Sequence, residues 1–89
     1  MQYTWREAKR RRNLKLHGLD FANGPAVFAG ATFTYEDDRM AYGEQRFVTL
    51  GLLDGVPVSI VHTETDHEIH FISFRKATRR ETTLYFNAI

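Results

Sequence analysis

Four basic residues near the C-terminus form the densest group of side chains that could act on a phosphate: Arg75, Lys76, Arg79 and Arg80. In a helix that begins near Lys76, the side chains of Lys76, Arg79 and Arg80 share one face. Free backbone N–H groups in the first turn of a helix favour an anion, whereas cations placed there oppose the helix dipole. An exposed charged face is the alternative, but cations in an unfavourable position indicate a functional role.

His62 is the side chain best suited to proton transfer, because an imidazole ordinarily titrates at about pH 6.5. It stands late in a predicted strand, opposite Phe47, so it is either an acid–base group or a half-buried packing residue. Tyr85, on the last predicted helix, could donate a proton or stack on a base. The spacing of Tyr85 also fits a core position, and both alternatives stay open for each residue.

Basic charge is concentrated at the two ends of the chain. Residues 1–17 carry a net +5, residues 18–74 a net −7 and residues 75–89 a net +3. The two ends either fold together into one patch for a polyanion or are solvated helix faces. The basic side chains predicted to contact phosphate, outside the C-terminal group, are Lys9, Arg10, Arg12, Lys15 and Arg46.

Composition excludes several other classes of site. The chain of 89 residues contains no cysteine, which excludes a disulfide scaffold and a thiolate metal site and favours a reducing compartment. Glu36, Asp37 and Asp38 are contiguous and are interpreted as a solvated loop, and the histidines lack zinc spacing. We therefore expect no metal, no cofactor, no signal peptide, no membrane span and a cytoplasmic location.

Three helices are predicted from caps and periodicity. Thr4-Trp5-Arg6-Glu7 has the form of a capping box, which predicts a helix over 5–16 that ends near Gly18. Asp20 could cap a second, shorter helix that ends near Phe28, although Pro25 favours a start near residue 23. The last helix is predicted over 76–88.

Four strands are predicted between these helices, over 32–36, 46–53, 56–64 and 68–74. Asp54-Gly55 is typical of a type I′ hairpin turn, which pairs Leu53 with Val56, Thr49 with Ile60, Phe47 with His62 and Arg46 with Thr63. This register divides the apolar residues between two sheet faces. One face carries Val48, Leu50, Leu52 and Val61; the other carries Phe47, Val56, Val58 and Ile60.

The predicted architecture is a single α+β domain over residues 1–89. It has two N-terminal helices, a four-stranded antiparallel sheet and a C-terminal helix. The helices can cover only one sheet face well, so we expect an apolar surface on the other face, which is typical of a protein interface.

Several motifs in the same order resemble the BrnT family. They are Trp5-x-Glu7-Ala8-Lys9-x-x-x-Asn13, His17-Gly18, Asp20-Phe21, Val27-Phe28, Gly43-Glu44-x-Arg46, Gly51, Asp54-Gly55, Val61-His62-Thr63-Glu64, Ile72-Ser73-x-Arg75-Lys76-Ala77, Arg79-Arg80-Glu81 and Tyr85. Each motif is weak alone, but together they cover nearly the whole chain. Three positions depart from the family pattern, at Leu16, His70 and Phe74, and the first two lack a cation that the family usually carries.

The resemblance implies a RelE-like fold and a ribonuclease toxin that halts translation. It also implies a cognate BrnA-like antitoxin with a ribbon-helix-helix part, in a hetero-oligomer that binds operator DNA only through the antitoxin. RNA cleavage without a metal needs a base, cations on the phosphate and an acid. The candidate catalytic residues are His62, Arg75, Lys76, Arg79, Arg80 and Tyr85. The rival hypothesis is a non-catalytic module that binds nucleic acid or protein through the same basic ends.

Overall fold

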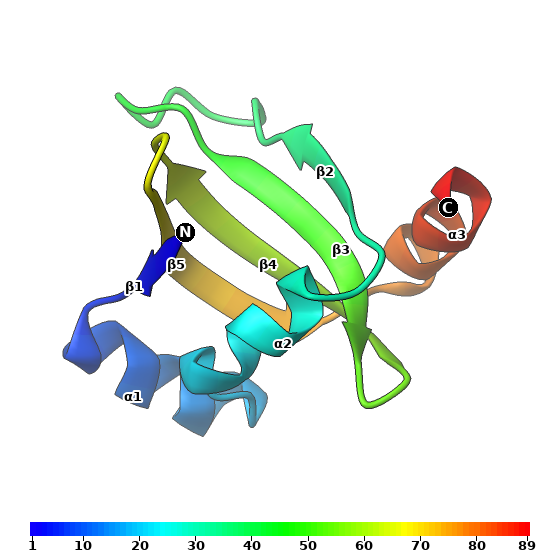
Figure 1. Cartoon of the computed structure of the whole chain (residues 1–89), viewed down its shortest axis with the longest axis horizontal. Helices are drawn as coiled ribbons and strands as arrows, with labels where there is room; N and C mark the ends of the chain where they lie inside the picture. The colour runs from blue at the N-terminus through cyan, green and yellow to red at the C-terminus, as the bar shows by residue number, and fades with distance from the viewer.

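A computed structural model describes residues 1–89 and shows one five-stranded sheet with helices on both faces (Figure 1). The strand order across the sheet is β1-β5-β4-β3-β2. A short 3-10 turn, Phe21–Asn23, precedes α2. The elements are β1 (Gln2–Thr4), α1 (Glu7–His17), α2 (Gly24–Phe28), β2 (Phe33–Glu36), β3 (Phe47–Leu53), β4 (Val56–Glu64), β5 (Glu68–Lys76) and α3 (Arg79–Ala88).

The α+β class and the central hairpin are confirmed. Asp54 and Gly55 have φ values of 51° and 79°, the positive values that a type I′ turn needs at both central residues. The turn sets the pairing of β3 with β4, in which Leu53 lies opposite Val56 and Phe47 lies opposite His62. Gly18 also ends α1 as expected, with a left-handed φ of 73° and its N–H bonded to the Leu14 carbonyl.

The predicted four-stranded antiparallel sheet is wrong, because a strand precedes the first helix. β1 pairs parallel with β5, which makes the sheet five-stranded and mixed. The capping box at Thr4 is wrong for the same reason: the Thr4 hydroxyl bonds to Glu68 instead, and Arg6 is the N-cap, without a side-chain cap. The second predicted helix is only a 3-10 turn, capped by Asp20 as expected, followed by the short α2.

The last helix begins three residues later than predicted. The Thr78 hydroxyl accepts the Glu81 N–H, and the Glu81 carboxylate accepts the Thr78 N–H, so the capping box lies here. Lys76 is therefore the final residue of β5 and Arg75 lies within that strand. Lys76 does not share a helix face with Arg79 and Arg80, as the sequence-based prediction had it.

The two sheet faces carry separate apolar clusters. The face covered by α2 and the 3-10 turn before it, here called the covered face, carries a cluster that includes Phe21, Val58 and Ile60. The other, here called the open face, carries Val48, Leu50 and Val61 with Tyr85 of α3 above them. α2 crosses the sheet on the covered face, whereas α3 lies at one end of the molecule (Figure 1). This division follows the predicted register.

A bulge in β5 lets two phenylalanines enter the covered face. Val61 pairs with Ser73 and His62 pairs with Phe71, so Ile72 is an extra residue between the two pairs. Phe71 and Phe74 are consequently both buried in the same cluster. The rings packed around Phe71, with centroids within about 6 Å, are those of Tyr3, Trp5, Phe21 and Phe28.

Two glycines allow the covering segment to approach the sheet closely. A Cβ built on Gly51 of β3 would lie 2.6 Å from the Val27 side chain, and one on Gly24 would lie 2.5 Å from the Phe71 ring. Neither distance is possible for real atoms, so any larger residue at these positions would push α2 away from the sheet.

Asn13 attaches the polar helix α1 to the sheet. It is the buried residue of this helix, 6% exposed. Its side-chain oxygen accepts the Phe74 N–H at 2.9 Å, and its amide donates to the carbonyls of Phe74 at 2.7 Å and Leu19 at 2.9 Å. These bonds satisfy the Phe74 backbone beyond the end of the short β1.

We predict that Asn13→Ala lowers the free energy of unfolding by about 2–3 kcal/mol, because it leaves buried backbone groups of Phe74 without partners. Urea denaturation measures this loss. Asn23→Ala is the matched control, since Asn23 is exposed and its side chain caps nothing; its effect should stay below about 0.5 kcal/mol. Equal effects of the two substitutions would contradict the role assigned to Asn13.

Candidate functional site

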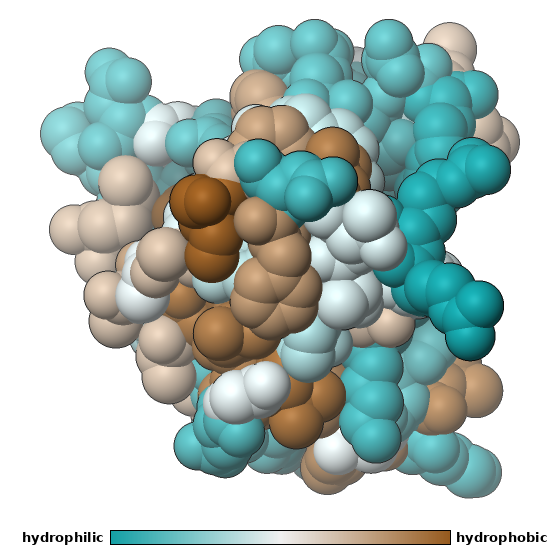
Figure 2. All heavy atoms as spheres, turned by 90° about the vertical axis from the view of Figure 1, so that its right-hand side faces the viewer, coloured by the Kyte–Doolittle hydropathy of each residue, from teal (hydrophilic) through white to brown (hydrophobic).

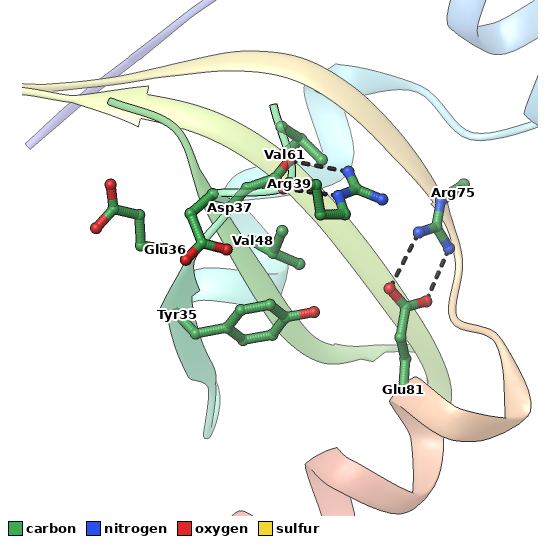
Figure 3. Close-up of a pocket in the computed structure, with 9 residues that line it drawn as sticks. Tyr35, Glu36, Asp37, Arg39, Val48, Val61, Arg75 and Glu81 are labelled. Atoms are coloured by element: carbon green, nitrogen blue, oxygen red, sulfur yellow. Dashed lines mark hydrogen bonds and ion pairs between the residues drawn. The ribbon is translucent and has the colours of Figure 1, made fainter. Parts of the chain in front are cut away.

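The open face of the sheet contains a cleft of about 150 Å³ beside the start of α3. Strands β2, β3, β4 and β5 contribute to it together with α3 and the loop after β2 (Figure 3). Its lining residues are Tyr35, Glu36, Asp37, Asp38, Arg39, Val48, Val61, Arg75 and Glu81. We call it the first cleft. Of the predicted catalytic residues, only Arg75 lines it.

Glu81 holds the Arg75 guanidinium in the first cleft. Two parallel bonds of 2.8 and 3.0 Å join the side chains (Figure 3), the bidentate geometry that fixes a guanidinium most firmly. Burial raises the pKa of Glu81, but the bonds from Arg75 and Thr78 outweigh it, so the pKa is lowered overall. Glu81 is therefore charged. Sequence reasoning missed it as a site residue, although the Thr78-x-x-Glu81 spacing was visible.

Tyr35 adds a neutral donor to the same cleft. Burial, and next the negative charge of Glu81, raise the pKa of its hydroxyl. The hydroxyl therefore keeps its proton, and it extends toward the side of the cleft on which Glu81 lies (Figure 3). Sequence analysis placed Tyr35 in a strand but gave it no role.

Asp37 organises the loop at the rim of the cleft. Its side chain is 2% exposed and accepts bonds of 2.7 and 2.9 Å from Arg39 and one of 3.1 Å from the Tyr42 hydroxyl. The bond from Arg39 is the largest cause of its lowered pKa. Glu36 and Asp38 are exposed, so the interpretation of all three acids as a solvated loop is wrong for Asp37.

A second cleft of about 200 Å³ gathers cations from both halves of the chain. Arg6 and Lys9 come from the first helix and the residue before it, and Arg46 comes from the approach to β3. Arg46 pairs with Glu44 at 3.1 Å and stacks 4.2 Å from the centre of the Tyr42 ring. The lining residues are Arg6, Lys9, Glu44, Arg46, His70, Phe71 and Ile72.

The remaining predicted cations are distributed over two faces. Arg10 is engaged by Glu7 at 2.6 Å and Asp20 at 3.0 Å. Arg12 and Lys15 are exposed on α1. Lys76, Arg79 and Arg80 are exposed and make no ion pair. Neither cleft contains cations from both basic ends: Arg6 and Lys9 line the second cleft, and Arg75 lines the first.

His62 and Tyr85 lie inside the molecule. His62 is 1% exposed; its Nε2 bonds to the Thr49 hydroxyl at 2.7 Å, and its Nδ1 has no hydrogen-bond partner. Burial lowers the pKa of His62 to about 4. Tyr85 is 2% exposed, and its hydroxyl donates to the Ala31 carbonyl at 2.9 Å. Neither side chain lines either cleft.

Neither a metal centre nor a membrane span is evident. No three His, Asp or Glu side chains are grouped so that they could bind one ion. None of the helices combines the length and the apolar character that crossing a bilayer requires.

The chain matches the model of a known protein family over most of its length. Residues 5–81 match the model of a family described as the ribonuclease toxin, BrnT, of type II toxin-antitoxin systems. The matched segment includes the lining residues of both clefts. No curated protein matches the chain.

We predict that His62 makes the fold acid-sensitive. Its folded pKa of about 4 lies below its ordinary value of about 6.5, so the unfolded chain binds the proton more tightly. The contribution of neutral His62 to the free energy of unfolding is fully present above pH 6.5 and is lost as the pH falls through 4. The total loss below pH 4 is about 3 kcal/mol. Urea denaturation at pH 7 and pH 5 measures the slope.

His62→Gln should flatten this slope between pH 7 and pH 5. The matched control is His67→Gln, which removes an exposed histidine and should keep the wild-type slope. If His62→Gln leaves the pH dependence unchanged, the buried imidazole is not its source.

Proposed function

We propose that this chain, which belongs to the BrnT family of type II toxin-antitoxin ribonuclease toxins, cuts RNA endonucleolytically, without a metal, by attack of a 2′-hydroxyl on the adjacent phosphate. The observation that carries the proposal is the group of cations at the start of α3. Arg75 is held by Glu81 in a cleft, while Lys76, Arg79 and Arg80 stand unpaired beside it. Such a group suits a polyanion that has phosphates at regular intervals.

The four cations would neutralise phosphate charge on the open face. Arg75 is fixed by its bidentate pair, and the neutral hydroxyl of Tyr35 is a second donor in the same cleft. Lys9 and Arg46 in the second cleft, with Arg12 and Lys15 on α1, would contact the RNA backbone without reading sequence. The phosphate contact predicted for Arg10 stays a prediction, because Glu7 and Asp20 hold its side chain.

The catalytic roles predicted for His62 and Tyr85 stay predictions. Both are buried and bonded to protein groups, so we assign them packing roles in the proposed mechanism. A non-catalytic module that binds nucleic acid or protein is the second candidate function, and the burial of these two titratable side chains favours it. Cleavage of RNA in the presence of EDTA distinguishes the two.

A cognate antitoxin is the proposed partner, in keeping with the type II family. We propose a BrnA-like protein with a ribbon-helix-helix part, in a hetero-oligomer that binds operator DNA through the antitoxin and blocks a toxin that otherwise halts translation in the cytoplasm. Large apolar side chains on α3 and the central hairpin are exposed: Val56, Leu84, Phe86 and Ile89. Figure 2 shows apolar residues gathered on this side of the molecule, bordered by polar ones.

We predict that the triple variant Lys76→Ala, Arg79→Ala, Arg80→Ala cuts a labelled RNA in EDTA at least about 100-fold more slowly than wild type at RNA concentrations below saturation, because it lacks three cations that bind the RNA backbone. The three side chains are exposed, so thermal unfolding should be unchanged. Arg11→Ala removes an exposed cation of α1 and should leave the rate within about two-fold of wild type. Wild-type cleavage by the triple variant would mean that the start of α3 does not bind the substrate.

We predict that antitoxin and RNA compete for the toxin. Acidic residues of the antitoxin would occupy the basic surface, because opposite potentials favour association. Titration of antitoxin into a complex of the toxin with an uncleavable RNA analogue should release the RNA, and antitoxin should raise the melting temperature of the toxin. If both bind together without mutual weakening, inhibition does not occur by occlusion.

A further inference from the structure

Three polar side chains beside the second cleft form a hydrogen-bonded chain. The Thr4 hydroxyl of β1 donates to the Glu68 carboxylate of β5, and the same Thr4 oxygen lies 2.8 Å from Nδ1 of His70. Parallel pairing of β1 with β5 places Thr4 directly beside His70. This arrangement depends on the strand that sequence analysis missed.

The chain of bonds fixes the tautomer of His70. A carboxylate only accepts hydrogen bonds, and a threonine hydroxyl has a single proton. Because that proton goes to Glu68, the Thr4 oxygen can only accept, so Nδ1 of His70 must carry the hydrogen. In the neutral imidazole, Nε2 then holds a free lone pair. This is how a base is oriented through its second ring nitrogen in nucleophilic enzymes.

The free nitrogen is accessible beside cations. The His70 side chain is 35% exposed and lines the second cleft with Arg6, Lys9 and Arg46. Nε2 of His70 makes no hydrogen bond within the protein and, unlike Nδ1 of His62, it is not buried. The cleft thus combines an available base with three cations and one acid, Glu44, which Arg46 partly neutralises.

We propose that His70 is the general base of RNA cleavage and that the scissile phosphate lies in the second cleft; the proposal rests on the ribonuclease function proposed above. Nε2 of His70 takes the 2′-hydroxyl proton as the O2′–P bond forms. The P–O5′ bond breaks, its electron pair stays on O5′, and O5′ takes a proton from solvent. His70 then returns its proton to solvent. The products are a 2′,3′-cyclic phosphate and a 5′-hydroxyl.

The two clefts would bind different phosphates of one RNA strand. Arg46 lines the second cleft and Val48 lines the first. They are two residues apart in the chain, so alternation along β3 places their side chains on the same sheet face. Lys9, Arg6 and Arg46 hold the reacting phosphate. Neighbouring phosphates of the same strand extend toward Arg75 and the start of α3.

The first test uses the full chain, a labelled RNA and EDTA. His70→Ala should slow cleavage by roughly 100-fold or more, and added imidazole should restore part of the rate by acting as an external base. His70→Gln keeps a polar side chain but cannot take up the proton, so it should cut as slowly as His70→Ala. His67→Gln, a nearby exposed histidine, should cut at the wild-type rate.

The second test separates orientation from folding. Thr4→Val removes the acceptor of the Nδ1–H and should lower the rate and alter its pH profile, whereas Thr4→Ser should restore both. The charged groups around His70 that contribute to this profile are Arg6, Lys9, Glu44, Arg46 and Glu68. Thermal unfolding checks that each variant is folded.

The outcomes are distinct for the two proposals. If wild-type chain cuts no RNA, the ribonuclease function fails. If wild type cuts and either His70→Ala or His70→Gln cuts equally well, or imidazole restores nothing, His70 is not the base although the function stands. Rescue by imidazole together with the Thr4→Ser result supports the assignment.

Discussion

The fold depends on how the polar helix α1 is fastened to strand β5. Apolar burial contributes little, because Asn13 is the residue of α1 that is buried. Instead the Asn13 side chain bonds both backbone groups of Phe74, a residue in the part of β5 that β1 is too short to pair with. A side-chain amide offers a donor and an acceptor together, so Asn13 makes the two backbone hydrogen bonds that a neighbouring strand would otherwise make with Phe74. The position of α1 in turn brings Lys9 to the second cleft.

Strand β5 is the structural element that both the core and the proposed chemistry share. Its bulge at Ile72 turns Phe71 and Phe74 to the covered face, where aromatic rings pack around Phe71. On its other side it carries His70 toward the second cleft and Arg75 toward the first. The same bulge sets the register of β5 between His70 and Arg75.

Burial decides which titratable groups can serve the proposed reaction. Two histidines lie on neighbouring strands of one sheet. His62 faces the covered side, where desolvation keeps it neutral and its Nδ1 finds no partner. His70 keeps contact with solvent and is linked through Thr4 to Glu68. The same contrast separates Arg10, held by two carboxylates, from Arg79 and Arg80, which remain available to a ligand.

The α+β class, the central hairpin and the division of apolar residues between two faces were predictable from the residues alone, because they depend on local turn chemistry at Asp54-Gly55 and on alternation along the strands. The positions of the basic groups were equally visible. That Thr4 joins a strand instead of capping a helix depends on long-range pairing, since its partner is 64 residues away. Local pattern likewise places His62 and His70 on strands. It does not show which sheet face α2 covers, and it does not show the bulge between Phe71 and Ser73, because both depend on contacts between distant segments.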